Sequence, residues 1–159
     1  MFNTAISLVQ NNEVAEDICQ DVFVTVFKSV AAFNEKSSLS TWLYRITVNK
    51  CLDHLRAKKR RKYSLFSQFF TTTAIENKPA FDHPGIKLEN RENARYLFEA
   101  IETLSHNQKT VFILAYVEEL SQKDIAEIMG ISVNAVESLI QRAKANLRKK
   151  LSGIYTKEK

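Results

Sequence analysis

Apolar residues recur at helical spacing along most of the chain, and the pattern is clearest over residues 120–151. Ser121 is a suitable N-cap, because its hydroxyl can accept a hydrogen bond from an amide of the first turn. Gly130 stands where a helix ends in the left-handed conformation that glycine adopts without strain. Ser132 caps a second helix, whose apolar stripe consists of Val136, Ile140, Ala143, Leu147 and Leu151. The stretch predicts two helices joined by a tight turn.

The side of the second helix opposite this stripe is polar and partly cationic. It carries Asn134, Glu137, Ser138, Gln141, Arg142, Lys144 and Arg148. A helix-turn-helix places the start of its second helix in the major groove, where such donors and acceptors distinguish base pairs. The alternative at this point is an ordinary helical hairpin with a solvated face.

An amphipathic helix is predicted over residues 12–33, after a short apolar segment that looks like the tail of a longer helix. Its apolar face is wide and is expected to form part of the core. It consists of Val14, Ile18, Val22, Phe23, Val26, Phe27 and Val30. Its other side begins acidic, with Glu13, Glu16, Asp17, Gln20 and Asp21. These carboxylates either match the helix dipole as a solvated face or form a docking surface for a basic partner.

A further helix is predicted from Thr41 to about Lys58, with Ser40 as its cap. One stripe of this helix begins with an aromatic residue and continues with polar ones: Trp42, Arg45, Asn49, Asp53 and Arg56. The helix runs into six cations within seven positions between Arg56 and Lys62. Such a run is either solvated or neutralised by a polyanion, and nearby aromatic rings favour a phosphate backbone with unstacked bases.

Helical periodicity lapses over residues 63–90, which we interpret as a flexible linker. Two platform helices are predicted after it, over residues 91–103 and from Ser105 onward, with Gln108 completing a capping box. The predicted fold is therefore all-α, with two small helical domains over residues 1–62 and 91–159.

Composition narrows the possible functions. With 3 Gly and 2 Pro in 159 residues, the chain has few of the residues that form tight turns between strands. The net charge of +5 favours an anionic partner. Cys19 and Cys51 fall on apolar stretches and predict no disulfide. The sequence shows no metal-ligand spacing, nucleotide fingerprint or nucleophile motif, so we expect no metal, cofactor or catalytic residue. No apolar run is long enough to enter a membrane, and a cytoplasmic protein is expected.

Taken together, the chain resembles an extracytoplasmic-function (ECF) sigma factor, a two-domain specificity subunit of bacterial RNA polymerase. The similarity to region two lies in AEDICQDVF (Ala15–Phe23), STWLYRI (Ser40–Ile46) and Asn49, Asp53, Leu55 and Arg56. The similarity to region four lies in DIAEIMGIS (Asp124–Ser132) and AVESLIQRAKANLRKKL (Ala135–Leu151).

This resemblance implies a set of partners and of binding residues. The coiled coil of the largest polymerase subunit would bind Glu16, Asp17, Gln20 and Asp21. The melted −10 element would contact Asn34, Lys36, Ser37, Ser38, Trp42, Arg45, Asn49, Arg56, Lys59 and Arg60. The −35 element would contact Asn134, Glu137, Ser138, Gln141, Arg142, Lys144 and Arg148. The polymerase flap region and an anti-sigma factor are further expected partners.

The chain departs from the family pattern in two places. Glu137 and Leu139 stand where relatives often carry a basic residue and an arginine, so Glu137 either alters base specificity or faces the polymerase. The first helix of region two is short here, which leaves the apolar face of residues 12–33 under-covered. We therefore expect an exposed apolar patch that a longer natural chain or a partner covers.

Two rival functions make different predictions. A stand-alone dimeric helix-turn-helix regulator would bind a palindromic duplex tightly without polymerase. A pure polymerase-docking adaptor would tolerate neutralisation of Arg60 and Arg61. A sigma factor would bind promoters specifically only with core polymerase.

Overall fold

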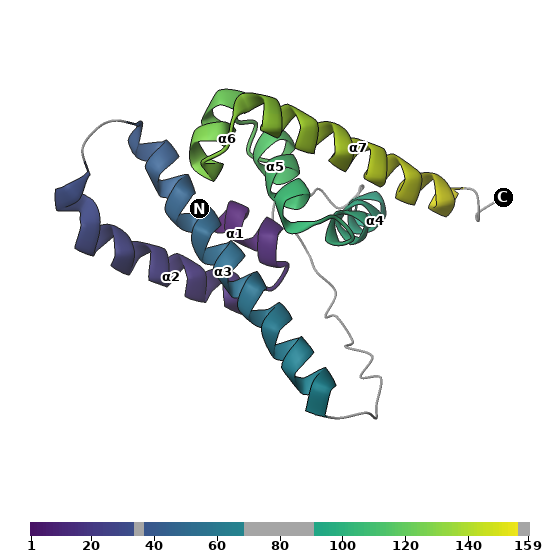
Figure 1. The fold of residues 1–159 in the computed structure, drawn as a ribbon, viewed down its shortest axis with the longest axis horizontal. Coiled ribbons are helices and arrows are strands. Elements are labelled where there is room, and N and C mark those ends of the chain that lie inside the picture. Colours follow the sequence, from purple (N-terminus) through teal and green to yellow (C-terminus); the bar gives the residue numbers. More distant parts are fainter. Residues whose placement is uncertain (34–36, 69–90, 156–159) are drawn as a thin grey trace.

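The computed structural model describes residues 1–33, 37–68 and 91–155, which form helices and, within these ranges, no strand. In chain order they are α1 (Phe2–Val9), α2 (Asn12–Ser29), the 3-10 helix η1 (Val30–Ala32), α3 (Leu39–Gln68), α4 (Arg91–Glu102), α5 (His106–Tyr116), α6 (Gln122–Met129) and α7 (Val133–Tyr155). The fold is all-α, as the sequence predicts, with an N-terminal half up to α3 and a C-terminal half from α4 (Figure 1).

Helix α1 occupies the middle of the molecule and contacts helices of both halves (Figure 1). It packs against α2, α3 and α5, and its Ile6 and Leu8 are 1% and 0% exposed. The helix ends at Gln10, whose φ of 50° is left-handed and turns the chain into α2. The segment is therefore a helix, as predicted, and it joins the apolar residues of the two halves in one core.

Helix α2 buries only the narrow side that faces α1 and α3. The Asn11 side chain caps it by accepting from the Val14 amide at 2.9 Å, and Ala15, Ile18 and Val22 are buried. Its outer side exposes Phe23 and Phe27 by 61% and 85%, and Val30 of the following η1 is 53% exposed. The prediction that these three belong to the core is wrong, whereas the predicted exposed apolar patch is present.

Helix α3 begins earlier and ends later than the sequence suggests. Its cap is Ser38 rather than Ser40, since the Ser38 hydroxyl accepts from the Thr41 amide at 3.1 Å. The helix continues to Gln68, beyond the expected end near Lys58 and into the first part of the expected linker. Lysine and arginine are good helix formers, so the basic run continues the helix instead of ending it.

The C-terminal half follows its local signals closely. The hydroxyls of Ser121 and Ser132 cap α6 and α7 through the amides of Asp124 and Ala135, both at 3.2 Å. Gly130 ends α6 with a φ of 65°. The predicted stripe of α7 is buried at Val136, Ile140, Ala143 and Leu147 and half-buried at Leu151. The two helices therefore form the predicted helix-turn-helix, supported by α5 against both of them and by α4 against α7.

The two halves also pack against each other. Helix α1 contacts α5, and α3 contacts α6, the first helix of the helix-turn-helix. The sequence predicts two domains but contains no sign of this contact between them.

Candidate nucleic-acid interface

The polar face of α7 is presented to solvent. Asn134, Glu137, Ser138, Gln141, Arg142 and Arg148 are all exposed, and the Ser138 hydroxyl donates to the Asn134 carbonyl at 2.9 Å. Lys144 differs, because it is half-buried and its ammonium lies 4.8 Å from the centre of the Tyr116 ring. The structure thus places six of the seven predicted −35 residues at the surface of one helix, while Lys144 is held by a cation–π contact.

Near the start of α3, the candidate −10 residue Trp42 forms an aromatic pair with Phe33. The half-buried Trp42 ring lies 5.1 Å from the Phe33 ring at an interplanar angle of 40°. Ser38 caps the helix beside it, and Ser37 is half-buried. Asn34 and Lys36 lie outside the described residues. The described part of the site therefore offers an aromatic surface at a helix start, which suits stacking of an unstacked base.

Farther along α3, the predicted −10 residues Arg45, Asn49, Arg56, Lys59 and Arg60 are all exposed. The Arg56 guanidinium pairs with Asp53 at 3.1 Å. The Arg45 guanidinium donates to the backbone carbonyl of Glu127, in α6, at 2.8 Å. These side chains form a cationic surface, and one of them is engaged by the helix-turn-helix.

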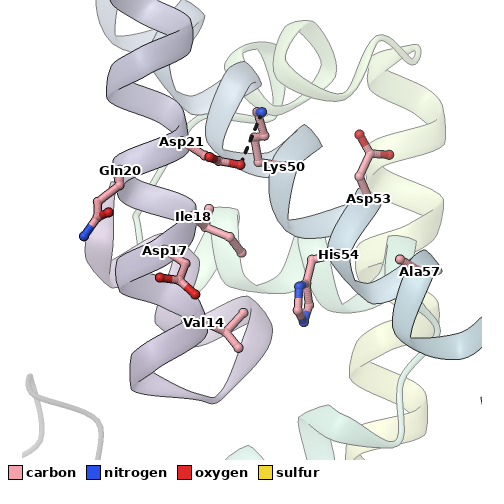
Figure 2. A pocket seen from close by; sticks show the side chains of 9 residues that line it. All are labelled: Val14, Asp17, Ile18, Gln20, Asp21, Lys50, Asp53, His54 and Ala57. Atoms are coloured by element: carbon pink, nitrogen blue, oxygen red, sulfur yellow. Dashed lines mark ion pairs between the residues drawn. The ribbon is translucent and has the colours of Figure 1, made fainter. Parts of the chain in front are cut away.

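The acidic side of α2 lines a groove against α3 (Figure 2). Its volume is about 610 Å³, and Asp17, Gln20 and Asp21 lie on its α2 wall. Lys50 and His54 lie on the opposite wall, and the Lys50 ammonium is 3.5 Å from the Asp21 carboxylate. The fourth predicted polymerase-binding residue, Glu16, is exposed and lines a separate hollow with Phe2 and Phe23.

Sequence reasoning missed Lys50 and His54 in this groove. They stand one helical turn apart on the side of α3 that faces α2, and this spacing was the available signal. A basic partner that binds this side of α2 would find the Asp21 carboxylate already paired with Lys50.

Glu118 is a second residue that sequence reasoning missed. It follows α5, and its carboxylate accepts from the Tyr44 hydroxyl at 2.8 Å and from the Thr4 hydroxyl at 2.9 Å. Burial of Tyr44, followed by its hydrogen bond to Glu118 and the charge of Glu118, raises the pKa of Tyr44 to about 12. No sequence signal marks these residues, because they are far apart in the chain.

Across the described ranges, no three His, Cys, Asp or Glu side chains gather in a way that could hold a metal ion. The same residues contain no helix that is both long and apolar enough to cross a membrane.

Comparison with known proteins identifies both halves. The family model for Sigma-70 region 2 matches residues 1–61, and that for Sigma-70 region 4 matches residues 94–147. The ECF RNA polymerase sigma factor SigW of Bacillus subtilis is 30% identical over 155 residues, covering 95% of this chain and 82% of SigW. The chain belongs to the ECF sigma factors. The ECF sigma-E factor of Haemophilus influenzae is 32% identical over 149 residues, covering 90% of this chain and 77% of that one.

A solved structure supports the same assignment. The sigma factor RpoE of Bartonella quintana, in complex with the anti-sigma factor NepR, aligns with a TM-score of 0.70 at 26% identity, covering 95% of this chain and 89% of RpoE. The function of this ECF sigma factor is thus to direct RNA polymerase in transcription initiation. Membership favours this function over a stand-alone dimeric regulator.

Proposed function

We propose that this ECF sigma factor divides promoter recognition between α7 and α3. The start of α7 reads the −35 element through Asn134, Ser138, Gln141 and Arg142, while Arg148 contacts phosphate. The observation that supports −35 recognition is the exposed polar face of α7, which begins directly after the turn of the helix-turn-helix. Glu137 lies on the same face, where its carboxylate can accept from a cytosine amino group.

In the −10 half, the start of α3 holds the melted strand. The Phe33–Trp42 pair provides a stacking surface, and Arg45, Asn49, Arg56, Lys59 and Arg60 provide polar and cationic contacts along the same helix. Extrusion of a base costs a few kcal/mol, and stacking on an aromatic ring returns about 1 to 3 kcal/mol. Cationic contacts to the backbone supply the remainder through counterion release.

The acidic side of α2 binds core polymerase. Glu16, Asp17, Gln20 and Asp21 are exposed on it, and Phe23 and Phe27 form an exposed apolar border. An apolar patch beside charged groups is the composition that stable protein interfaces prefer. The expected partner is the coiled coil of the largest polymerase subunit, with the flap region engaging the C-terminal half.

An anti-sigma factor is a further proposed partner. The relative RpoE is described in complex with the anti-sigma factor NepR, and the alignment with RpoE spans almost the whole of this chain. Because its partners are polymerase and promoter DNA, we place this sigma factor in the cytoplasm.

Transcription in vitro with purified core polymerase and a promoter library tests the proposed function. The holoenzyme should start at a defined set of promoters, and core alone should not. Within this assay Arg142→Ala should relax selectivity at one −35 base pair by about 1 to 3 kcal/mol, which is the discrimination of a bidentate contact. Lys28→Ala removes the same charge from α2 and should leave −35 selectivity unchanged. Absence of start-site selection by the holoenzyme would refute the proposal.

Core binding needs a separate measurement. Asp17→Asn should weaken the affinity of the sigma factor for core polymerase, measured by fluorescence anisotropy of the labelled protein. Glu99→Gln removes an exposed carboxylate from α4 and serves as the control. Equal affinities for the two variants would exclude Asp17 from the interface.

A further inference from the structure

Glu118 ties the two halves of the molecule together. Its carboxylate is half-buried between α1 and α3, where one oxygen accepts from Thr4 at 2.9 Å and the other from Tyr44 at 2.8 Å. Thr4 is fully buried, and its hydroxyl therefore depends on this acceptor. Hydrogen bonds to a charged acceptor are roughly twice as strong as those between neutral groups. One side chain of the C-terminal half thus holds two helices of the N-terminal half.

Two additional hydrogen bonds cross the same boundary. The Arg45 guanidinium donates to the Glu127 carbonyl at 2.8 Å, and the side-chain amide of Gln10 donates to the Phe98 carbonyl at 3.3 Å. The first of these attaches α6 to a residue of the −10 surface. We call this packing of the two halves the closed arrangement. In it, Arg45 is hydrogen-bonded to the half that is proposed to read the −35 element.

The closed arrangement is incompatible with simultaneous binding of both promoter elements. The −35 and −10 elements are about 25 base pairs apart, which is roughly 85 Å along straight duplex DNA. Helix α6 contacts α3 directly, and α7 packs on α6. Packed helices lie about 8 to 10 Å apart, so the two DNA-binding surfaces are too close to reach both elements. The two halves must separate when the promoter is bound.

We propose that Glu118 is a latch that keeps the free sigma factor closed and withholds Arg45 from DNA. This inference rests on the proposed function, because that function assigns Arg45 to the −10 element. The latch is polar, so water can replace its hydrogen bonds when the halves separate. The apolar contact of α1 with α5 must part in the same opening. Only molecules in the open state are competent to bind, so the apparent affinity for the −10 strand is reduced by the fraction that is open.

The latch can be tested on the purified full chain without polymerase. Glu118→Ala removes both hydrogen bonds, and Tyr44→Phe removes one while keeping the ring. Glu119→Ala is the matched control, because Glu119 is the adjacent exposed carboxylate and makes no hydrogen bond or ion pair to the N-terminal half in the described part of the chain. Small-angle X-ray scattering should show a larger radius of gyration for Glu118→Ala, a smaller increase for Tyr44→Phe, and no change for Glu119→Ala.

Binding of a short fluorescein-labelled single-stranded DNA of mixed sequence provides the second readout. If the latch shifts the closed-to-open equilibrium by about 1.4 kcal/mol, Glu118→Ala should bind about tenfold more tightly than the wild type. Glu119→Ala should bind within about twofold of the wild type.

Several results would overturn the latch. These are superimposable scattering curves for the wild type and Glu118→Ala, equal opening in Glu119→Ala, or opening without tighter DNA binding. Should Glu118→Ala be unfolded by circular dichroism, Tyr44→Phe decides the matter by the same two readouts. Failure of the transcription assay would instead refute the proposed function, because the scattering measurement needs neither promoter nor polymerase.

Discussion

Replacement of Ile6 by alanine should destabilise both halves of the sigma factor together. Ile6 is 1% exposed in α1, the helix that packs against α2, α3 and α5. Truncation of a buried isoleucine to alanine removes the transfer free energy of its methyl and methylene groups and leaves a cavity, which together cost about 2 to 5 kcal/mol. With about 3 kcal/mol as the central value, a chain of this length should lose about 6 to 12 °C in Tm.

Two probes make this measurement specific to α1. Fluorescence of the single tryptophan, Trp42, reports on the N-terminal half, and far-ultraviolet circular dichroism reports on all helices. Because α1 contacts both halves, the two unfolding curves of Ile6→Ala should shift by the same amount. Ile6→Val should cost only about 0.5 to 1.5 kcal/mol, since it removes a single methylene group.

Phe27→Ala is the matched control. It removes a larger apolar side chain from a helix, but Phe27 is 85% exposed. Surface substitutions of this kind usually change stability by less than about 0.5 kcal/mol. The reasoning fails if Ile6→Ala costs no more than Phe27→Ala, or if a second transition in the circular dichroism curve stays at the wild-type temperature.

Three smaller predictions concern single residues. Gly130→Ala should lower the free energy of unfolding by about 1 kcal/mol, measured by urea titration. The cause is the left-handed φ of 65°, since an added Cβ would meet nothing within 4 Å. Gly130→Asn should cost less in the same titration, because asparagine tolerates this conformation better. An alkylating reagent should label Cys19 before Cys51 by mass spectrometry, since Cys51 is buried and burial raises its pKa to about 12. Burial, followed by the charge of Lys109, lowers the pKa of His106 from 6.5 in the folded protein. As pH falls, the imidazole of the unfolded chain is therefore protonated before that of the folded chain. Stability should therefore fall as pH drops below about 6.5, and His106→Gln should reduce this fall in thermal melts.

The helix-turn-helix could be predicted from the sequence because its signals are local. Ser121, Gly130 and Ser132 act within a few residues of their own position, and each has the role that its residue type favours. The buried stripe of α7 follows from one period of 3.6 residues. The sequence does not determine where α3 starts, because Ser38 and Ser40 are equally suitable caps, and only the hydrogen bond to the Thr41 amide distinguishes them.

The apolar face of α2 shows why periodicity overestimates a core. Phe23 and Phe27 continue the helical pattern of Ile18 and Val22. An apolar face this wide is buried completely only when neighbouring helices cover both of its sides. The described part of the chain supplies α1 and α3 on one side only. A pattern of residue types states which side chains prefer burial, and it does not state how many neighbours are present to bury them.

The contact between the halves could not be predicted at all, and its chemistry explains why. Thr4 and Glu118 are separated by 114 positions, and Tyr44 and Glu118 by 74, so no periodic pattern links them. Thr and Glu are mostly exposed in proteins and Tyr is intermediate, so none of the three residue types signals a buried contact. The hydrogen-bonded part of the junction is polar, and water can replace its bonds in the proposed opening of the sigma factor on its promoter.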